Sequence, residues 1–259
     1  MDDIHAMILR GDEPPRHSRP AITELDFAST ELDDLAPLRG LTALESLNLH
    51  DTAVSDVEPI AGLTSLKDLL MSGTPVTDIA PLAGLKALKS LYLRGAPISD
   101  ATPLGGLANL EWLDLAFTRV RDAAPLAGLT ALKGLYLVKT DIPDARPLAG
   151  LTSLRELYLN DTKIVGAAPL ANLKELETLD LSGAPIRDAA PLAGLTGLRT
   201  LAITDTRIAD VSPLAGLTNL DWLELSTHSV ANSSALDLLV ENGLRIKWKD
   251  PAPDDRIRD

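Results

Sequence analysis

Hydrophobic positions along this chain follow one pattern that repeats every 22 residues. In the first half of a unit two leucines flank a polar residue, as Leu47 and Leu49 flank Asn48, and this period of two predicts a short strand with one buried face. A turn and a single β-branched residue, Val54 in this unit, follow. The second half places apolar residues three apart, at Val57, Ile60, Leu63 and Leu66. Side chains three apart line up on one edge of a 3₁₀ coil, so we expect short 3₁₀ turns there instead of an α-helix.

Prolines keep the same period through most of the chain. They occur at Pro37, Pro59, Pro81, Pro103, Pro125, Pro147, Pro169, Pro191 and Pro213. An aspartate stands three residues earlier in eight units, at Asp34, Asp56, Asp78, Asp100, Asp122, Asp144, Asp188 and Asp210. Proline lacks a backbone N–H and suits the first turn of a helix, while a carboxylate accepts hydrogen bonds from the unpaired N–H groups there. We therefore interpret these aspartates as caps, in preference to a column of calcium ligands.

A fixed period of this length predicts a solenoid, in which each unit buries its apolar side only against its neighbours. We therefore expect one elongated α/β domain instead of two globular ones. Residues 22–241 are expected to form ten repeats, residues 1–21 an N-terminal cap and connector, and residues 242–259 a C-terminal cap strand and tail.

Both ends of the chain depart from the repeat in ways that suit the ends of a stack. Ile4, Met7 and Ile8 share one face of a predicted helix that covers the first coil. At the other end, residues 234–243 lack the proline and predict an α-helix. Alternating apolar residues then predict a final strand over residues 244–248, and the last residues are expected to form a loose tail.

The composition disfavours several classes of function. The chain has no cysteine, which rules out disulfides, thiolate metal sites and cysteine nucleophiles. Its net charge of −13 disfavours nucleic acid and anionic membranes, because phosphate groups require a basic surface. The first ten residues are acidic and their apolar run is too short for a signal peptide or a membrane span. We therefore expect a cytoplasmic protein that is monomeric on its own and uses no cofactor or metal.

The repeat resembles that of the leucine-rich repeat family, in its 22-residue internalin-type bacterial subclass. The segments LTALESLNLHDTAVSDVEPIAGL and LANLEWLDLAFTRVRDAAPLAGL carry the motif, and near-copies cover residues 22–241. The resemblance implies an arc with a parallel β-sheet on the concave face, short 3₁₀ turns on the convex face, and a concave face that commonly binds a partner protein. One column departs from the family, since threonine, as at Thr52, often replaces the usual buried asparagine. We therefore expect weaker bonds than an asparagine ladder. The signal sequence and surface anchor of internalins are not seen, so their role in host-cell attachment is not carried over.

Residues that alternate with the buried leucines point to the concave face, and packing does not explain them. Three such columns give thirty positions, which hold five of the eight aromatic residues. The five are Tyr92, Trp112, Tyr136, Tyr158 and Trp222, and Phe117 borders the face beside Trp112. Tyrosine and tryptophan offer a large contact area with few rotamers to fix, which favours a binding surface. The alternative is that aromatics on neighbouring strands, such as Tyr136 and Tyr158, only stack on each other and stiffen the sheet.

The same thirty positions are strongly acidic. They hold seven acidic residues and a single basic one, Arg94. An acidic and aromatic face favours a partner with a basic patch, although a solvated face is the alternative for each acid taken alone. The candidate partner-binding residues are therefore Tyr92, Arg94, Trp112, Asp114, Phe117, Tyr136, Tyr158, Asp180, Trp222 and Glu224.

Catalysis finds little support in the sequence. His5 and His17 lie in the N-terminal cap region and His228 lies in a predicted turn. His50 precedes Asp51, but neighbouring strand residues point in opposite directions, so no dyad is expected. We therefore expect a non-enzymatic protein-binding module. The alternatives are a regulatory or inhibitory scaffold subunit of an enzyme complex, an exported bacterial effector, and a consensus-designed repeat protein.

Overall fold

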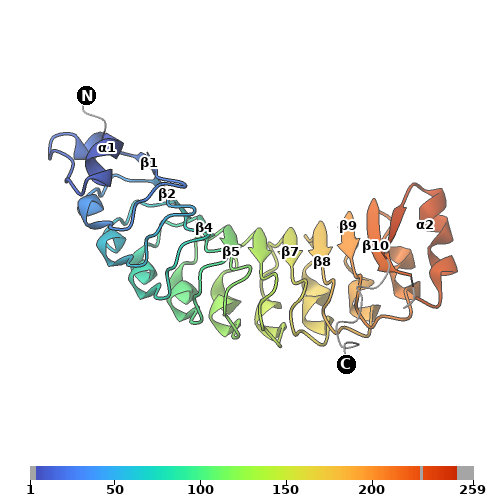
Figure 1. Ribbon diagram of the computed structural model, residues 1–259. Coiled ribbons are helices and arrows are strands. Elements are labelled where there is room, and N and C mark those ends of the chain that lie inside the picture. The colour runs from blue at the N-terminus through green and yellow to red at the C-terminus, as the bar shows by residue number, and fades with distance from the viewer. Residues whose placement is uncertain (1–3, 228–229, 250–259) are drawn as a thin grey trace.

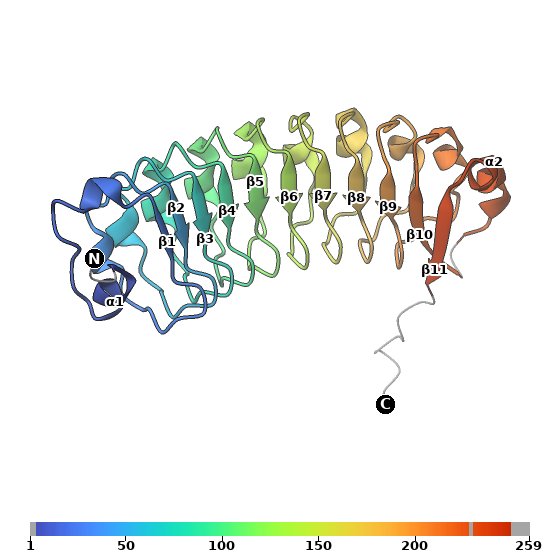
Figure 2. The same ribbon diagram turned by 90° about the horizontal axis from the view of Figure 1, so that it is seen from above.

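The computed structural model describes residues 4–227 and 230–249, and its strands form one open parallel sheet in chain order. Each strand pairs with the next one repeat later, so that Leu47 lies beside Leu69 and Leu69 beside Leu91. Figure 2 shows the strands side by side in this order. Their bounds are β1 Glu24–Asp26, β2 Ser46–Asn48, β3 Asp68–Leu70, β4 Ser90–Tyr92, β5 Trp112–Asp114, β6 Gly134–Tyr136, β7 Glu156–Tyr158, β8 Thr178–Asp180, β9 Thr200–Ala202, β10 Trp222–Ser226 and β11 Arg245–Lys249.

The second half of each repeat returns through a 3₁₀ helix, as the spacing of three predicts. Strands follow the inner side of a shallow arc and the 3₁₀ helices lie on its outer side (Figure 1). This arrangement confirms the α/β solenoid with a parallel sheet on the concave face. The 3₁₀ helices are η1 Arg19–Ala21, η2 Ala36–Leu38, η3 Glu58–Ile60, η4 Ala80–Gly84, η5 Thr102–Gly106, η6 Ala124–Gly128, η7 Arg146–Leu148, η8 Ala168–Asn172, η9 Ala190–Leu192, η10 Ser212–Gly216 and η11 Ser233–Leu236.

The two ends of the stack are closed by short helices. α1 (Ile4–Leu9) buries Ile8 against the first coil, as its apolar face predicts. The predicted C-terminal helix is shorter than expected, because a 3₁₀ turn occupies residues 233–236 and the α-helical part, α2, covers only Asp237–Glu241. The predicted last strand is present as β11. The expected tail from residue 251 and the turn at His228 lie outside the described residues.

A single apolar core runs the length of the stack. The leucines of the strands and the apolar residues of the 3₁₀ turns are almost all fully buried, and they form one continuous cluster from α1 to β11. None of the described helices has both the length and the hydropathy that a membrane span requires.

The capping aspartates act as predicted, with one shift in position. In all eight, Oδ1 accepts a hydrogen bond of 2.8–2.9 Å from the backbone N–H two residues later. Asp122, for example, accepts from Ala124, the first residue of η6. The aspartate therefore stands one residue before the formal cap position, and its carboxylate closes an Asx turn that leads into the 3₁₀ helix.

Threonine in the turn column forms a local bond, not a ladder between repeats. The Thr140 hydroxyl donates to the carbonyl of Leu137 at 2.7 Å, and Thr52 donates to Leu49 in the same way. The same three-residue bond occurs at Thr30, Thr74, Thr118, Thr162 and Thr206. Each threonine thus closes its own turn and does not bond to the next repeat.

Candidate functional site

The middle strands place the predicted aromatics and acids in one row on the concave face. The sheet register aligns Tyr92, Asp114, Tyr136, Tyr158 and Asp180 as direct neighbours on β4 to β8. The leucines on either side of each of them are buried, so this row points away from the core. Trp112 opens β5, two residues before Asp114 of the row. We define the central aromatic patch as Tyr92, Trp112, Tyr136 and Tyr158.

Tyr136 and Tyr158 stack on each other, as their shared column allows. Their ring centroids are 5.0 Å apart and the planes differ by 10°. The Tyr136 hydroxyl also donates to Glu156 Oε2 at 2.5 Å. Partial burial, reinforced by this bond, raises the pKa of Tyr136, and partial burial also raises the pKa of Tyr158. Both phenols therefore remain protonated at neutral pH.

Trp112 is positioned by the absence of a side chain on the neighbouring strand. Gly134 lies directly beside it in the register, and a Cβ atom at Gly134 would come closer than 3.0 Å to two atoms of the indole ring. The ring therefore occupies the space that a side chain on β6 would take. The same Cβ would lie 3.4 Å from the Tyr136 ring, so the indole and the Tyr136 ring border the same space beside Gly134.

The acids in the central column have a structural role that the sequence interpretation missed. Asp114 Oδ1 accepts from the N–H of Ala116 at 2.8 Å, and Asp180 Oδ1 accepts from the N–H of Ser182 at 2.9 Å. Asp26 forms the same bond where its strand ends. Asp114 is only 8% exposed, and desolvation raises its pKa and that of Asp180, although the backbone bonds oppose the rise. These acids thus end strands through their backbone bonds, in addition to placing charge on the concave face.

A cavity of about 390 Å³ adjoins the patch at the edge where the strands begin. Trp112 and Glu156 line it together with Lys133, Arg155, Glu177 and Thr178. The cations of this edge are paired with acids of adjacent repeats. Glu111 contacts both Lys89 and Lys133, and Arg155 lies 3.6 Å from Glu177.

The C-terminal end of the concave face is basic, which the thirty-position count did not include. β11 places Arg245, Lys247 and Lys249 beside Trp222, Glu224 and Ser226 of β10. Lys247 Nζ donates to Glu224 at 3.0 Å, and the Trp222 indole N–H donates to the same carboxylate at 3.1 Å. These bonds hold the pKa of Glu224 below its usual value, although partial burial opposes them. Trp222 and Glu224 thus form a separate cluster at the end of the sheet.

Arg94 and Phe117 also lie apart from the central aromatic patch. The strands are only three residues long here, so both residues fall in the turns that follow β4 and β5. The Arg94 guanidinium carbon lies 4.5 Å from the centroid of the Phe117 ring. The ten predicted residues therefore form three groups, at the patch, at β10 and on the turn edge.

The expectation for His50 was wrong in its geometry. His50 Nε2 lies 3.1 Å from Asp51 Oδ2, because both residues belong to the turn after β2 and Asp51 has a φ of +53°. The alternation of strand side chains does not apply there. Both side chains are about half exposed, and the pair lies on the turn edge, away from the patch.

The geometry so far defines an open parallel solenoid with an aromatic and acidic inner face. A sequence profile described as leucine-rich repeats (two copies) matches residues 152–194. An internalin C2 (inlC2) structure from Listeria monocytogenes is 31% identical, with a TM-score of 0.62, and the match covers 85% of this chain and 90% of that one. The chain belongs to the leucine-rich repeat family, in its internalin-type branch.

Other solved structures share the fold. An internalin (inlF) from Listeria monocytogenes is 25% identical with a TM-score of 0.68, over 96% of this chain and 89% of that one. The plant peptide hormone receptor RGFR1, solved in complex with RGF2, is 17% identical with a TM-score of 0.72, over 92% of this chain and 46% of that one. The search of curated proteins found no match. Leucine-rich repeat proteins commonly bind protein partners, and their repeats are typically interaction modules.

Proposed function

We propose that the chain is a non-enzymatic protein-binding module whose central aromatic patch contacts the partner. The observation that carries this proposal is the way in which Gly134 makes room for the Trp112 ring. Gly134 leaves open the space that the indole occupies, and no stiffening of the sheet requires a glycine beside a tryptophan. Stacked aromatics that only stabilise the sheet would need the Tyr136–Tyr158 pair alone.

The patch has the properties of a recognition surface. Its tyrosines are half-buried, so their rotamers are largely fixed before binding and little side-chain entropy is lost on contact. The phenols of Tyr136 and Tyr158 are held protonated and carry polar groups beside apolar ring faces. The cavity beside Trp112 gives the partner a recess for a side chain.

We propose that the partner presents a basic patch to β4–β8. Asp68, Asp114, Glu156 and Asp180 lie in the concave columns of β3 to β8. The cations of β11 lie at the far end of the sheet, three strands from β8, and of the causes that shift the pKa of Asp180, led by desolvation, the charge of Lys249 is the smallest. Because Asp114 and Asp180 also bond to the backbone, their contribution to a partner is electrostatic more than a direct ion pair.

Affinity capture with a matched control tests the proposal. The wild-type protein and a variant with Tyr92, Trp112, Tyr136 and Tyr158 all replaced by alanine are immobilised and exposed to extract of the native cell, and bound proteins are quantified by mass spectrometry. We expect one protein to be enriched on the wild type and lost on the variant, while Trp222→Ala retains it. Equal capture by the wild type and the quadruple variant, with both folded by circular dichroism, refutes the patch as the site. A complex that stays stoichiometric through gel filtration favours the regulatory-subunit alternative over a transient module.

A further inference from the structure

A second surface lies on the edge where the turns follow the strands. We define the edge patch as Arg94, Phe117, Arg119 and Lys139. Phe117 has a φ of +59° and its side chain is 42% exposed. Glycine, aspartate or serine takes this left-handed turn position in most repeats, as at Gly73, Gly95 and Asp161. A phenylalanine there carries backbone strain and exposes an apolar ring, and it contributes nothing to the core.

Two cations from neighbouring repeats border the Phe117 ring. Arg94, one repeat earlier, lies 4.5 Å from its centroid, and Lys139, one repeat later, lies 5.3 Å away. Both distances are within the range of cation–π attraction, so the ring holds the two charges on its own edge of the arc. The strained ring thus gathers positive charge on a protein with a net charge of −13.

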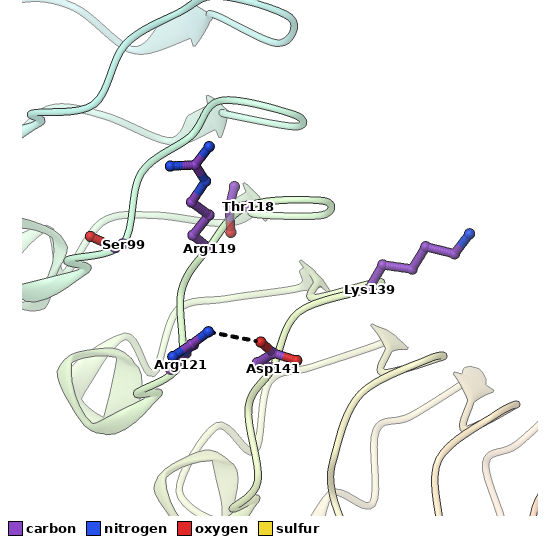
Figure 3. A pocket seen from close by; sticks show the side chains of 6 residues that line it. All are labelled: Ser99, Thr118, Arg119, Arg121, Lys139 and Asp141. Atoms are coloured by element: carbon purple, nitrogen blue, oxygen red, sulfur yellow. Dashed lines mark ion pairs between the residues drawn. The ribbon is translucent and has the colours of Figure 1, made fainter.

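One cavity is lined by Phe117 and a second by Thr118, the next residue in the chain. One of about 390 Å³ is lined by Phe117, Arg94 and Ser72 among others. The other, of about 380 Å³, is lined by Ser99, Thr118, Arg119, Arg121, Lys139 and Asp141 (Figure 3). The acid in the second cavity, Asp141, is already paired with Arg121 at 3.3 Å. Arg119 and Lys139 form no ion pair with any residue in the described part of the chain.

Arg119 and Lys139 differ in their ion pairing from the cations on the opposite edge of the strands. There Lys133 and Lys89 share Glu111, and Lys67 lies 2.7 Å from Glu45. Those charges are compensated within the protein. The edge patch keeps its positive charge available to a ligand.

We propose that the edge patch binds an acidic, extended peptide segment of a partner protein. Arg119 and Lys139 extend in different directions from their loops instead of converging (Figure 3). A single phosphate or carboxylate would therefore not contact both, whereas a segment with several carboxylates spans them. The exposed Phe117 ring lies between Arg94 and Lys139, at 4.5 Å and 5.3 Å from them, and offers an apolar contact to the same segment. A long nucleic acid is disfavoured because the three cations of the edge patch, on a protein with a net charge of −13, do not form the continuous basic stripe that a phosphate backbone requires.

This inference goes beyond the concave-face function and does not depend on it. The probe is a fluorescein-labelled peptide of eight glutamates with one central phenylalanine, and binding is followed by fluorescence anisotropy at low salt. We expect the double variant Arg119→Glu/Lys139→Glu to weaken binding about tenfold, since it reverses two charges. The single variant Arg119→Glu is compared with Arg207→Glu as its matched control, because Arg207 occupies the column of Arg119 four repeats later and its N–H also bonds to the preceding repeat.

Two further arms make the result decisive. Phe117→Gly is expected to weaken peptide binding several-fold. The melting temperature is expected to stay equal or to rise, because glycine relieves the strain of the left-handed conformation. An oligothymidylate of equal charge is expected to bind more weakly than the peptide. The proposal is overturned if the wild type does not bind the peptide, or if Arg207→Glu weakens peptide binding as much as Arg119→Glu does. It is also overturned if the oligonucleotide binds the wild type as tightly as the peptide.

Discussion

The repeat that lacks its aspartate provides a direct test of how the caps stabilise the stack. Gly166 stands at the position that an aspartate occupies in eight other units. A Cβ atom built on Gly166 has no heavy atom within 4 Å, and Gly166 is not among the glycines with positive φ. Gly166→Asp is therefore expected to accept the N–H of Ala168, as Asp122 accepts that of Ala124 at 2.8 Å.

Two effects add in this substitution. A side-chain cap contributes about 1 kcal/mol, and replacing glycine at an ordinary φ contributes about 0.4–1 kcal/mol by restricting the unfolded chain. We expect the free energy of unfolding to rise by about 1.5–2 kcal/mol. For a domain of this size, the melting temperature then rises by about 3–8 °C.

Calorimetry of three variants separates the two effects. Gly166→Ala is expected to give only the backbone part, and Gly166→Asn to give the backbone part and the cap without a new charge. Gly166→Asp and Gly166→Asn should both exceed Gly166→Ala. The interpretation fails if alanine stabilises the protein as much as aspartate and asparagine do, because the carboxylate bond would then contribute nothing.

Three further predictions concern the concave face. Gly134→Ala forces the Trp112 ring to move by about 1 Å or more, because a normal carbon contact must be restored. We therefore expect affinity for the captured partner to fall about tenfold while the melting temperature changes by under 4 °C. Full affinity would show that the position of the ring does not matter for binding. Burial raises the pKa of Asp114, so its charged form destabilises the fold and stability falls as pH rises through that pKa. Asp114→Asn should therefore be more stable than the wild type at pH 7 and equal to it below about pH 3 in urea titrations, and an equal gain at both pH values would contradict this. Tyr136→Phe removes the hydroxyl that donates to Glu156 and keeps the ring stack. We expect the free energy of unfolding, measured by urea denaturation, to fall by about 1 kcal/mol. An unchanged free energy would show that the bond is not formed in solution.

The sequence determines the scaffold almost completely because the repeat samples each position many times. Strand, 3₁₀ turn and cap follow from spacings that recur in every unit, and the Tyr136–Tyr158 stack follows from their shared column. The helix at residues 234–243 was predicted too long, since it occurs once and no second copy shows that its first turn, from Ser233, is 3₁₀.

The site was less predictable for a local reason. Columns assign a side chain to a face but do not show its hydrogen bonds, so the backbone bonds of Asp114 and Asp180 were missed. The capping aspartates indicate the bonds that were missed, because they also bond to the N–H two residues later. Strands of three residues also end earlier than the alternation suggests, which moves Arg94 and His50 into turns.

The left-handed conformation of Phe117 could also be predicted from the residues in its column of the repeat. Glycine, aspartate and serine dominate that column, and such residues indicate a left-handed turn. Phe117 and Lys139, with φ of +59° and +52°, are the two exceptions in this column, and both belong to the edge patch.

Site-specific photo-crosslinking most directly tests the claim that the concave aromatic patch contacts the partner. Benzoylphenylalanine replaces Tyr158 on β7 in one variant and Ala190, exposed on the outer 3₁₀ helix η9, in the other. Both variants are irradiated with the captured partner. We predict a covalent adduct from position 158 and none from position 190. An adduct from position 190 alone, or equal adducts from both, would contradict the account.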